Sequence, residues 1–118
     1  MSRYKSSLRE RARAYAIETY GLSKSIAARF PALRSAGEQL FRAAGSIGAN
    51  LAESEGLNTR KELAARYSIA LKESKEALYW LQLIETSEVS LRDRTAPLVA
   101  ECKEFIAMMT TGLQKLRS

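Results

Sequence analysis

Apolar residues recur at alternating spacings of three and four along four long segments of this chain. That rhythm places the apolar side chains of each segment on one face of an α-helix. Its average is close to 3.5 residues, which is typical of helices that pack together at a shallow angle. Only two prolines and six glycines are available for turns. The sequence therefore predicts long helices with short connections.

The boundaries of the first three helices follow from local signals. Pro31 ends the first helix, because the residue before a proline avoids the helical region. Gly56 is a natural stop for the second. Thr59 and Glu62 have the spacing of a capping box, which marks the start of the third. The predicted helices span residues 5–29, 33–56, 59–86 and 95–117.

The last connection is predicted over residues 87–95, which are mostly polar. Pro97 suits the first turn of the fourth helix, with Asp93 or Thr95 as its cap. Short links force consecutive helices to be antiparallel neighbours. We therefore predict an all-α fold, an antiparallel up-down-up-down four-helix bundle, as one domain over residues 1–118.

The apolar stripes also predict the core. Each helix contributes large side chains to it, among them Leu40, Ile47, Leu81 and Phe105, and Phe41 is predicted to widen the stripe of the second helix. Cys102, the single cysteine, lies in the fourth stripe and is predicted to be a small buried hydrophobe. One cysteine cannot form an internal disulfide, which fits a reducing cytoplasm.

No apolar run approaches the ~20 residues needed to cross a bilayer. Basic residues near the N-terminus are not followed by the apolar core of a secretory signal. The sequence thus indicates a cytoplasmic protein that interacts with no membrane.

Positive charge is concentrated in the first half of the chain. The formal net charge is +6, and residues 1–60 hold ten Lys and Arg against five Glu, whereas residues 61–118 hold nine against eight Asp and Glu. Clustered cations favour a polyanion, because binding releases its counterions. A solvated basic surface is the equal alternative. The candidates for a nucleic-acid or acidic-partner surface are Arg3, Lys5, Arg9, Arg11, Arg13, Arg29, Arg34, Arg60 and Lys61.

A polar ladder is predicted along the second helix. Its members recur at spacings of four, four and three, and two glutamates of the third helix are placed to meet the first of them; the set is Arg42, Ser46, Asn50, Glu53, Glu73 and Glu76. Three interpretations stay open: a buried network that fixes helix register, a subunit interface, and a ligand site. Each buried charge would need a partner.

Two further features concern packing. Tyr79 and Trp80 are consecutive, so at most one of them lies fully in the stripe. The other is predicted at the stripe edge or in an interface, with base stacking as a less favoured role. The second helix is unusually rich in Gly and Ala, which predicts close approach of a neighbouring helix.

Residues 40–53, read as LFRAAGSIGANLAE, followed by Gly56, resemble the signature of the four helix bundle protein family, also called the 23S rRNA intervening sequence protein family. Residues 70–81 are similar to one branch of that family, and Phe30-Pro31 sits where the family has Phe-Pro. Gly48 stands where proline is usual and Leu51 where isoleucine is usual. Gly48 restores a backbone N–H, so a smaller kink is expected here.

The resemblance implies a bacterial, left-handed four-helix bundle that assembles as a homopentamer. Relatives include the accessory proteins of diversity-generating retroelements, which bind a reverse transcriptase and nucleic acid. No catalytic residues carry over.

The sequence offers little support for an enzyme. It has no histidine, which removes the commonest general base and metal ligand, and one cysteine cannot build a zinc site. We expect no cofactor and no metal. The predicted function is a non-catalytic homo-oligomeric scaffold that binds RNA or DNA, or a nucleic-acid enzyme such as a reverse transcriptase. A protein-binding module without nucleic-acid affinity is the alternative. The least favoured function is a small-molecule-binding or catalytic bundle, which would have an interior cavity lined by Arg42, Asn50 and Glu53.

Overall fold

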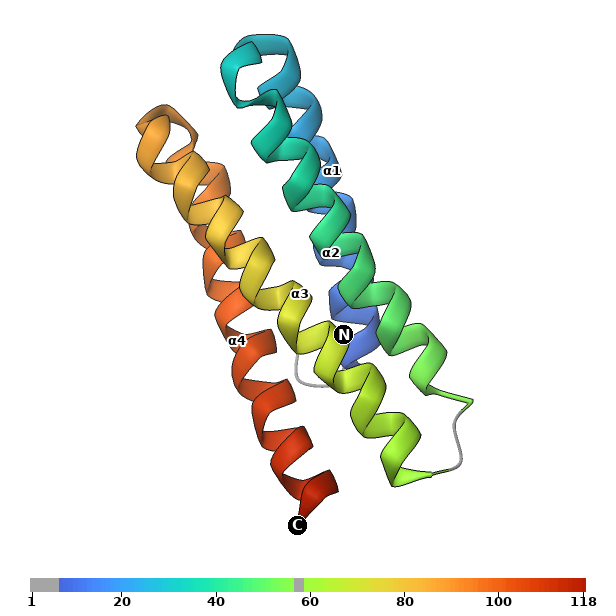
Figure 1. The fold of residues 1–118 in the computed structure, drawn as a ribbon. Coiled ribbons are helices and arrows are strands. Elements are labelled where there is room, and N and C mark those ends of the chain that lie inside the picture. The colour runs from blue at the N-terminus through green and yellow to red at the C-terminus, as the bar shows by residue number, and fades with distance from the viewer. Residues whose placement is uncertain (1–6, 57–58) are drawn as a thin grey trace.

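The computed structural model describes residues 7–56 and 59–118, which form four α-helices and no strand (Figure 1). The helices are α1 (Leu8–Arg29), α2 (Arg34–Ser54), α3 (Arg60–Ser87) and α4 (Arg92–Arg117), with short 3₁₀ helices η2 (Pro31–Leu33) and η3 (Val89–Leu91). They pack against one another in a bundle of 45 × 29 × 21 Å. The predicted all-α four-helix bundle is confirmed.

The bundle consists of two helical hairpins, α1–α2 and α3–α4, whose tight turns lie at the same end of the molecule (Figure 1). The end of α2, the start of α3 and the C-terminus lie at the opposite end. α2 packs on α1 and α3, and α3 packs on α4. α1 and α4 approach each other mainly through side chains, such as the edge of the Tyr15 ring against Phe105, with centroids 5.3 Å apart.

Side-chain caps define where α1 and α3 begin. Ser7 Oγ accepts a hydrogen bond from the Glu10 N–H at 3.0 Å, and the Glu10 carboxylate accepts one from the Ser7 N–H at 3.4 Å. This capping box starts the described helix at Leu8 rather than at residue 5; residues 1–6 lie outside the described residues. Thr59 caps α3 by accepting from the Glu62 N–H at 3.1 Å. The Glu62 carboxylate accepts from the Thr59 hydroxyl at 2.8 Å, where a full box would use the Thr59 backbone N–H.

The prediction of a loop over residues 87–95 was wrong. η3 leads directly into α4, which begins at Arg92, so Pro97 lies inside the helix and not in its first turn. Neither Asp93 nor Thr95 caps the helix; Thr95 is buried, and its hydroxyl donates to the Glu85 carboxylate at 2.8 Å. Leu91 is also buried. Burial of Leu91 and Thr95 favours helical backbone here and outweighs the cost of Pro97.

The core contains the side chains that the stripes predict. Leu40, Ile47, Leu81 and Phe105 have no exposed surface. Cys102 is fully buried, its thiol donates to the Ser74 carbonyl at 3.1 Å, and burial raises the pKa of the thiol to about 11. The prediction for Phe41 was wrong, because its ring stays 39% exposed on the outer side of α2. It points away from the core because its neighbour Leu40 already occupies the inward position.

Glycines allow α2 to approach α1 closely. A Cβ at Gly37 would lie 3.2 Å from the Ser23 hydroxyl, which is tighter than ordinary packing. Gly48 faces Ala12 of α1, where a Cβ would make normal contact at 3.9 Å. α2 runs uninterrupted through Gly48, the position where the resembling family has proline.

Candidate functional site

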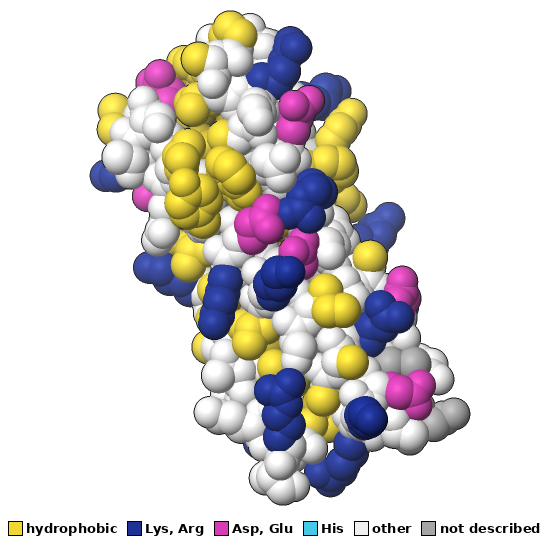
Figure 2. Space-filling model, viewed as in Figure 1, with side chains coloured by type: hydrophobic (Ala, Val, Ile, Leu, Met, Phe, Trp, Pro, Cys, Tyr) yellow, Lys and Arg dark blue, Asp and Glu magenta, His cyan; other side chains and the backbone are white. Residues whose placement is uncertain are grey.

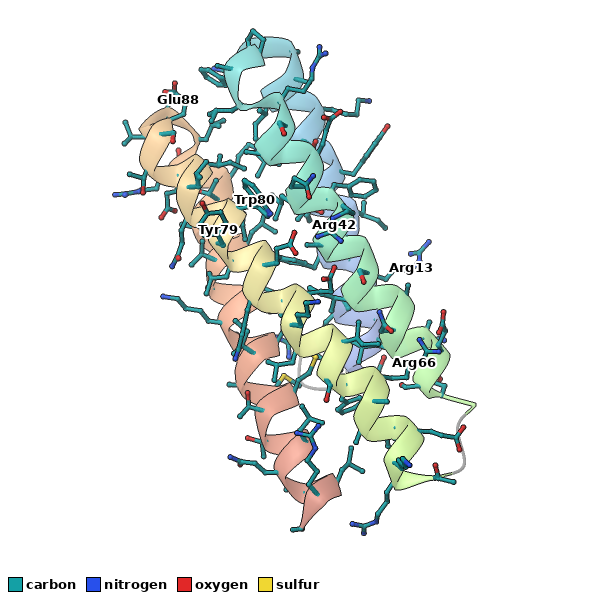
Figure 3. The ribbon with its side chains drawn as sticks, in the orientation of Figure 1. Arg13, Arg42, Arg66, Tyr79, Trp80 and Glu88 are labelled. Atoms are coloured by element: carbon teal, nitrogen blue, oxygen red, sulfur yellow. The ribbon has the colours of Figure 1, made fainter. Side chains whose placement is uncertain are left out.

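The upper part of the polar ladder is an ion cluster between α2 and α3 (Figure 3). Arg42 Nη1 lies 3.0 Å from a Glu73 oxygen, and Arg42 Nη2 pairs with Glu76. The Trp80 indole N–H donates to Glu76 at 3.2 Å. The hydrogen bond from Arg42 lowers the pKa of Glu76, with a smaller effect from Trp80, and the pKa of Arg42 is raised mainly by Glu76. The predicted contact of Glu73 and Glu76 with Arg42 is present.

The lower part is a separate cluster that uses a residue missed in the sequence. Asn50 Nδ2 donates to the Ser46 carbonyl at 2.9 Å. Arg66 of α3 donates to Asn50 Oδ1 at 3.1 Å and pairs with Glu53 at 2.7 Å. No spacing within α2 indicates Arg66, because it comes from another helix and only the α2–α3 register brings it near.

Both clusters join α2 to α3 at the edge of the interface. Asn50 and Glu73 are buried, whereas the side chains of Arg42 and Glu53 are 49% and 57% exposed. Two such exposed charges do not line an interior cavity. Of the three interpretations, the contacts within this chain match a network that sets helix register. Because the Arg42 side chain is half exposed, solvent screening keeps the contribution of its ion pairs to stability modest.

Tyr79 and Trp80 point in different directions on α3 (Figure 3). Trp80 is partly buried against the core, and Tyr79 is 57% exposed. Their rings meet edge to face with centroids 5.0 Å apart. Tyr79 therefore leaves an aromatic ring available at the surface.

The basic residues of α1 do not form one open surface. Arg11 pairs with Glu101 at 2.6 Å and Glu104 at 3.0 Å, and its side chain is only 13% exposed. These partners raise the pKa of Arg11, with Glu101 the main cause. Arg9 pairs with Glu55 at 2.7 Å. Arg13 is exposed, projects outward (Figure 3), and makes no ion pair with a described residue. Assigning Arg11 to an accessible surface was wrong, because its guanidinium holds α1 to α4.

The other predicted basic residues are scattered. Arg29 and Arg34 flank the α1–α2 turn, whereas Arg60 and Lys61 start α3 at the opposite end of the bundle (Figure 1). Arg3 and Lys5 lie outside the described residues. The seven candidates within the described ranges therefore do not form one continuous surface.

Another set of cations, which shares only Arg60 and Lys61 with the predicted candidates, gathers on α3 and α4. A groove of about 340 Å³ between these helices is lined by three cations and no carboxylate; its lining is Ser68, Leu71, Lys72, Lys75, Leu113 and Arg117. Further cations lie where the start of α3 meets the end of α4. There an Arg60 guanidinium N–H donates to the Lys115 carbonyl at 3.4 Å. We call the set Arg60, Lys61, Lys72, Lys75, Lys115 and Arg117 the basic face. In the lower part of Figure 2, few Asp or Glu side chains accompany the Lys and Arg.

A count of charges along the sequence does not reveal the basic face. Ion pairs between helices neutralise some cations and leave others unpaired, and the sequence does not show which. Glu73, Glu76 and Glu101 of the second half pair with arginines of the first. Those contacts neutralise cations of α1 and α2 and leave Lys72, Lys75 and Arg117 without an ion pair to a described residue. No member of the basic face forms an ion pair with a described residue.

Within the ranges that the structure describes, no helix is long and apolar enough to cross a membrane. The same residues contain no group of three His, Cys, Asp or Glu side chains placed to hold a metal ion.

The fold and these surfaces define a basic four-helix bundle whose polar contacts serve mainly to join its helices. The family model of the 23S rRNA-intervening sequence proteins matches residues 5–111, and the chain belongs to this family. The resemblance seen in the sequence is thus confirmed.

A solved structure has the same fold. It is a protein from Bacteroides thetaiotaomicron, described as one of unknown function from the S23 ribosomal protein family. The TM-score is 0.82 at 24% identity, and the match covers 91% of this chain and 98% of that one. No curated protein matches the chain.

Proposed function

We propose that this protein is a non-catalytic, homo-oligomeric scaffold that binds RNA through the basic face. The observation that carries the proposal is the groove in which Lys72, Lys75 and Arg117 meet no carboxylate. Unpaired cations in a groove favour a polyanion, because phosphate contacts release counterions. The absence of histidine from the sequence and the lack of a metal-holding cluster in the described residues support a role without catalysis.

The chemistry of the groove favours phosphate over base recognition. Two of its three cations are lysines, which act as point charges rather than planar forks. Ser68 Oγ, which accepts a hydrogen bond from Arg117 at 2.9 Å, orients that guanidinium. Contacts of this kind position a nucleic acid without reading its sequence. The expected binding is therefore salt-dependent and tolerant of sequence.

The test is RNA binding by a triple charge reversal, Lys72→Glu, Lys75→Glu and Arg117→Glu. We expect affinity for a fluorescent RNA oligonucleotide to fall by about tenfold or more at moderate salt, because three phosphate contacts are lost. The slope of log affinity against log salt should decrease by about one for each lost contact. Fluorescence anisotropy over a salt series measures both quantities.

The matched control reverses three exposed cations near the other end of the bundle, Lys24, Arg29 and Arg34. It changes the net charge by the same amount, so a general charge effect would lower affinity equally in both variants. Equal losses, or salt-insensitive binding, would refute the basic face. Arg11 is unsuitable for such a test, because its reversal would break contacts to Glu101 and Glu104.

An adaptor role between RNA and a reverse transcriptase extends the same proposal. Its support is what the family resemblance implies about retroelement accessory proteins, whereas the basic face supports the RNA side. Pull-down of a reverse transcriptase from the native cells, with and without nuclease, tests it. Loss of the complex on nuclease treatment indicates a bridge made by RNA, and absence of the enzyme from both samples contradicts the adaptor role.

A protein-binding module without nucleic-acid affinity is the second candidate. The observation that favours it is the exposed apolar surface of α1 and α2, where Ile17, Tyr20 and Phe41 lie open. Complexes that survive nuclease treatment, together with no affinity for RNA at low salt, would select this function.

A further inference from the structure

The exposed Tyr79 ring lies beside the groove of the basic face. Spacings of four, three and four residues place one stripe of side chains on the same side of α3: Ser68, Lys72, Lys75 and Tyr79. Around the helix axis Tyr79 falls between Lys72 and Lys75, and these three side chains are exposed. The first three members of the stripe also line the groove, with Arg117 of α4. The groove therefore continues along α3 to an aromatic ring.

Contact with Trp80 holds the Tyr79 ring in place. The two rings meet edge to face at an interplanar angle of 78°, and the Trp80 indole N–H donates to Glu76 at 3.2 Å. An edge-to-face contact covers at most one face of the tyrosine ring, and the Tyr79 side chain stays 57% exposed. Much of the ring is therefore accessible to a flat partner. A ring held in this way loses little conformational freedom when a partner covers it.

The charge around the ring stays positive although two glutamates lie nearby. Lys72 is close enough to Glu76 to contribute to the lowering of its pKa, but the largest contribution comes from Arg42. Four cations stand against two carboxylates in this part of the surface; the cations are Arg42, Lys72, Lys75 and Arg117, and the carboxylates are Glu73 and Glu76. The surroundings of Tyr79 therefore attract phosphate.

We propose that the basic face binds single-stranded RNA, with one unpaired base stacked on the Tyr79 ring and the adjoining phosphates on Lys72 and Lys75. Lys75 and Tyr79 are four residues apart, which is about 6 Å along the helix axis. That separation is comparable with the size of one nucleotide, so a phosphate on Lys75 leaves its base within reach of the ring. The inference rests on RNA binding by the basic face, and it deepens that function by naming the form of the RNA.

The chemistry of this surface selects a single strand over two other occupants. In an RNA duplex the faces of the bases are covered by their neighbours, so a ring on a helix surface meets only edges and backbone. In protein interfaces lysine is depleted, whereas this ring is flanked by two lysines. Single strands bind a basic groove with an aromatic ring beside it, because every base has a flat face. This setting favours base stacking for Tyr79, the role that the sequence favoured less.

The test compares Tyr79→Ala with the wild type on a fluorescent single-stranded RNA of mixed sequence and on the same strand annealed to its complement. We expect the affinity for the single strand to fall about fivefold or more, the low end of the range for one stacked base. The affinity for the duplex should change by less than about twofold, because its bases cannot stack on the ring. Tyr79→Phe should bind both forms like the wild type, since stacking uses the ring and not the hydroxyl group. Fluorescence anisotropy at one salt concentration measures these affinities.

A matched control and an internal probe locate the effect. Tyr20→Ala removes a tyrosine that is 49% exposed on α1, in the other hairpin, and should leave both affinities unchanged. Trp80 is the single tryptophan of the sequence and its ring contacts Tyr79, so its emission reports on this site. Saturating single-stranded RNA should change the Trp80 emission of the wild type, and duplex RNA should change it less.

Several results would overturn the stacking inference while the proposed function stands. They are an unchanged single-strand affinity in Tyr79→Ala, equal losses for the two forms of RNA, an equal loss in Tyr79→Phe or in Tyr20→Ala, and an unchanged Trp80 emission at saturation. In each case the triple charge reversal of the basic face would still lower RNA affinity. A wild type that binds neither form of RNA would overturn both the inference and the proposed function. Circular dichroism confirms that the variants remain helical.

Discussion

The buried hydroxyl group of Tyr15 lacks the hydrogen bond that buried polar groups normally make. The Tyr15 side chain lies in the core, and no hydrogen bond of normal geometry joins its hydroxyl to a described residue. Burial raises the pKa of Tyr15, and the neighbouring Cys102 thiol raises it further. The Tyr15 ring packs edge to face on Phe105, so the hydrocarbon part of the side chain makes a favourable aromatic contact. An unsatisfied buried hydroxyl costs stability because it loses water without replacement.

We expect Tyr15→Phe to raise the free energy of unfolding by about 1 kcal/mol, since it removes the unsatisfied group and keeps the ring. Urea denaturation of both proteins at neutral pH measures the difference. Tyr15→Ala is the control and should destabilise by about 3–5 kcal/mol through the cavity it leaves. A loss of stability in the phenylalanine variant would indicate that the hydroxyl has a partner.

At the scale of elements, α4 shows tertiary burial prevailing over a local signal. Pro97 lies at the sixth position of the helix, beyond the first turn where proline is tolerated. It removes the hydrogen bond that its N–H would give to the Asp93 carbonyl. That carbonyl belongs to an exposed residue, so solvent is available to satisfy it. Contacts of Leu91 and Thr95 then hold the first turn in place.

Pro97→Ala should therefore stabilise the protein by about 1 kcal/mol, because it restores a backbone hydrogen bond at an exposed site. The full helix-interior penalty of about 3 kcal/mol is an upper limit, since proline also restricts the unfolded chain. Thermal unfolding monitored by circular dichroism checks the shift. An unchanged or lower midpoint would mean that the ring itself packs usefully against its surroundings.

At the scale of the whole molecule, ion pairs connect neighbouring helices of the bundle. Arg42 joins α2 to α3, and Arg66 joins the same two helices nearer the start of α3. Arg11 joins α1 to α4. The carboxylates in these pairs must stay ionised for the contacts to persist. The folded protein lowers the pKa of Glu76 below its ordinary value of 4.5. Its contribution is therefore complete above that value and is lost as the pH falls through the folded pKa.

Glu76→Gln tests this dependence, because glutamine keeps an acceptor for Trp80 and removes the charge. At about pH 7 the variant should be less stable by under about 1 kcal/mol, given the exposure of Arg42. The difference should shrink towards zero as the pH is lowered well below 4.5. Urea denaturation at a series of pH values measures it. A difference that is independent of pH would assign the effect to packing rather than charge.

The sequence alone determined the helices, their antiparallel order and most of the core. Those features follow from periodicity and turn signals, which act over a few residues and can be read along the chain. The cap at Thr59 and the burial of Leu40, Leu81 and Phe105 are of this kind.

Only the tertiary structure decided which charges are free. Arg11 was expected on the surface but is held by Glu101. Arg66 was overlooked, although it completes the Asn50 cluster. Lys72 belongs to a basic face that a count of charges in each half of the chain did not reveal. The physical reason is that an ion pair acts through space over a few ångströms. Its partners lie on different helices, and nothing in the local sequence records their register.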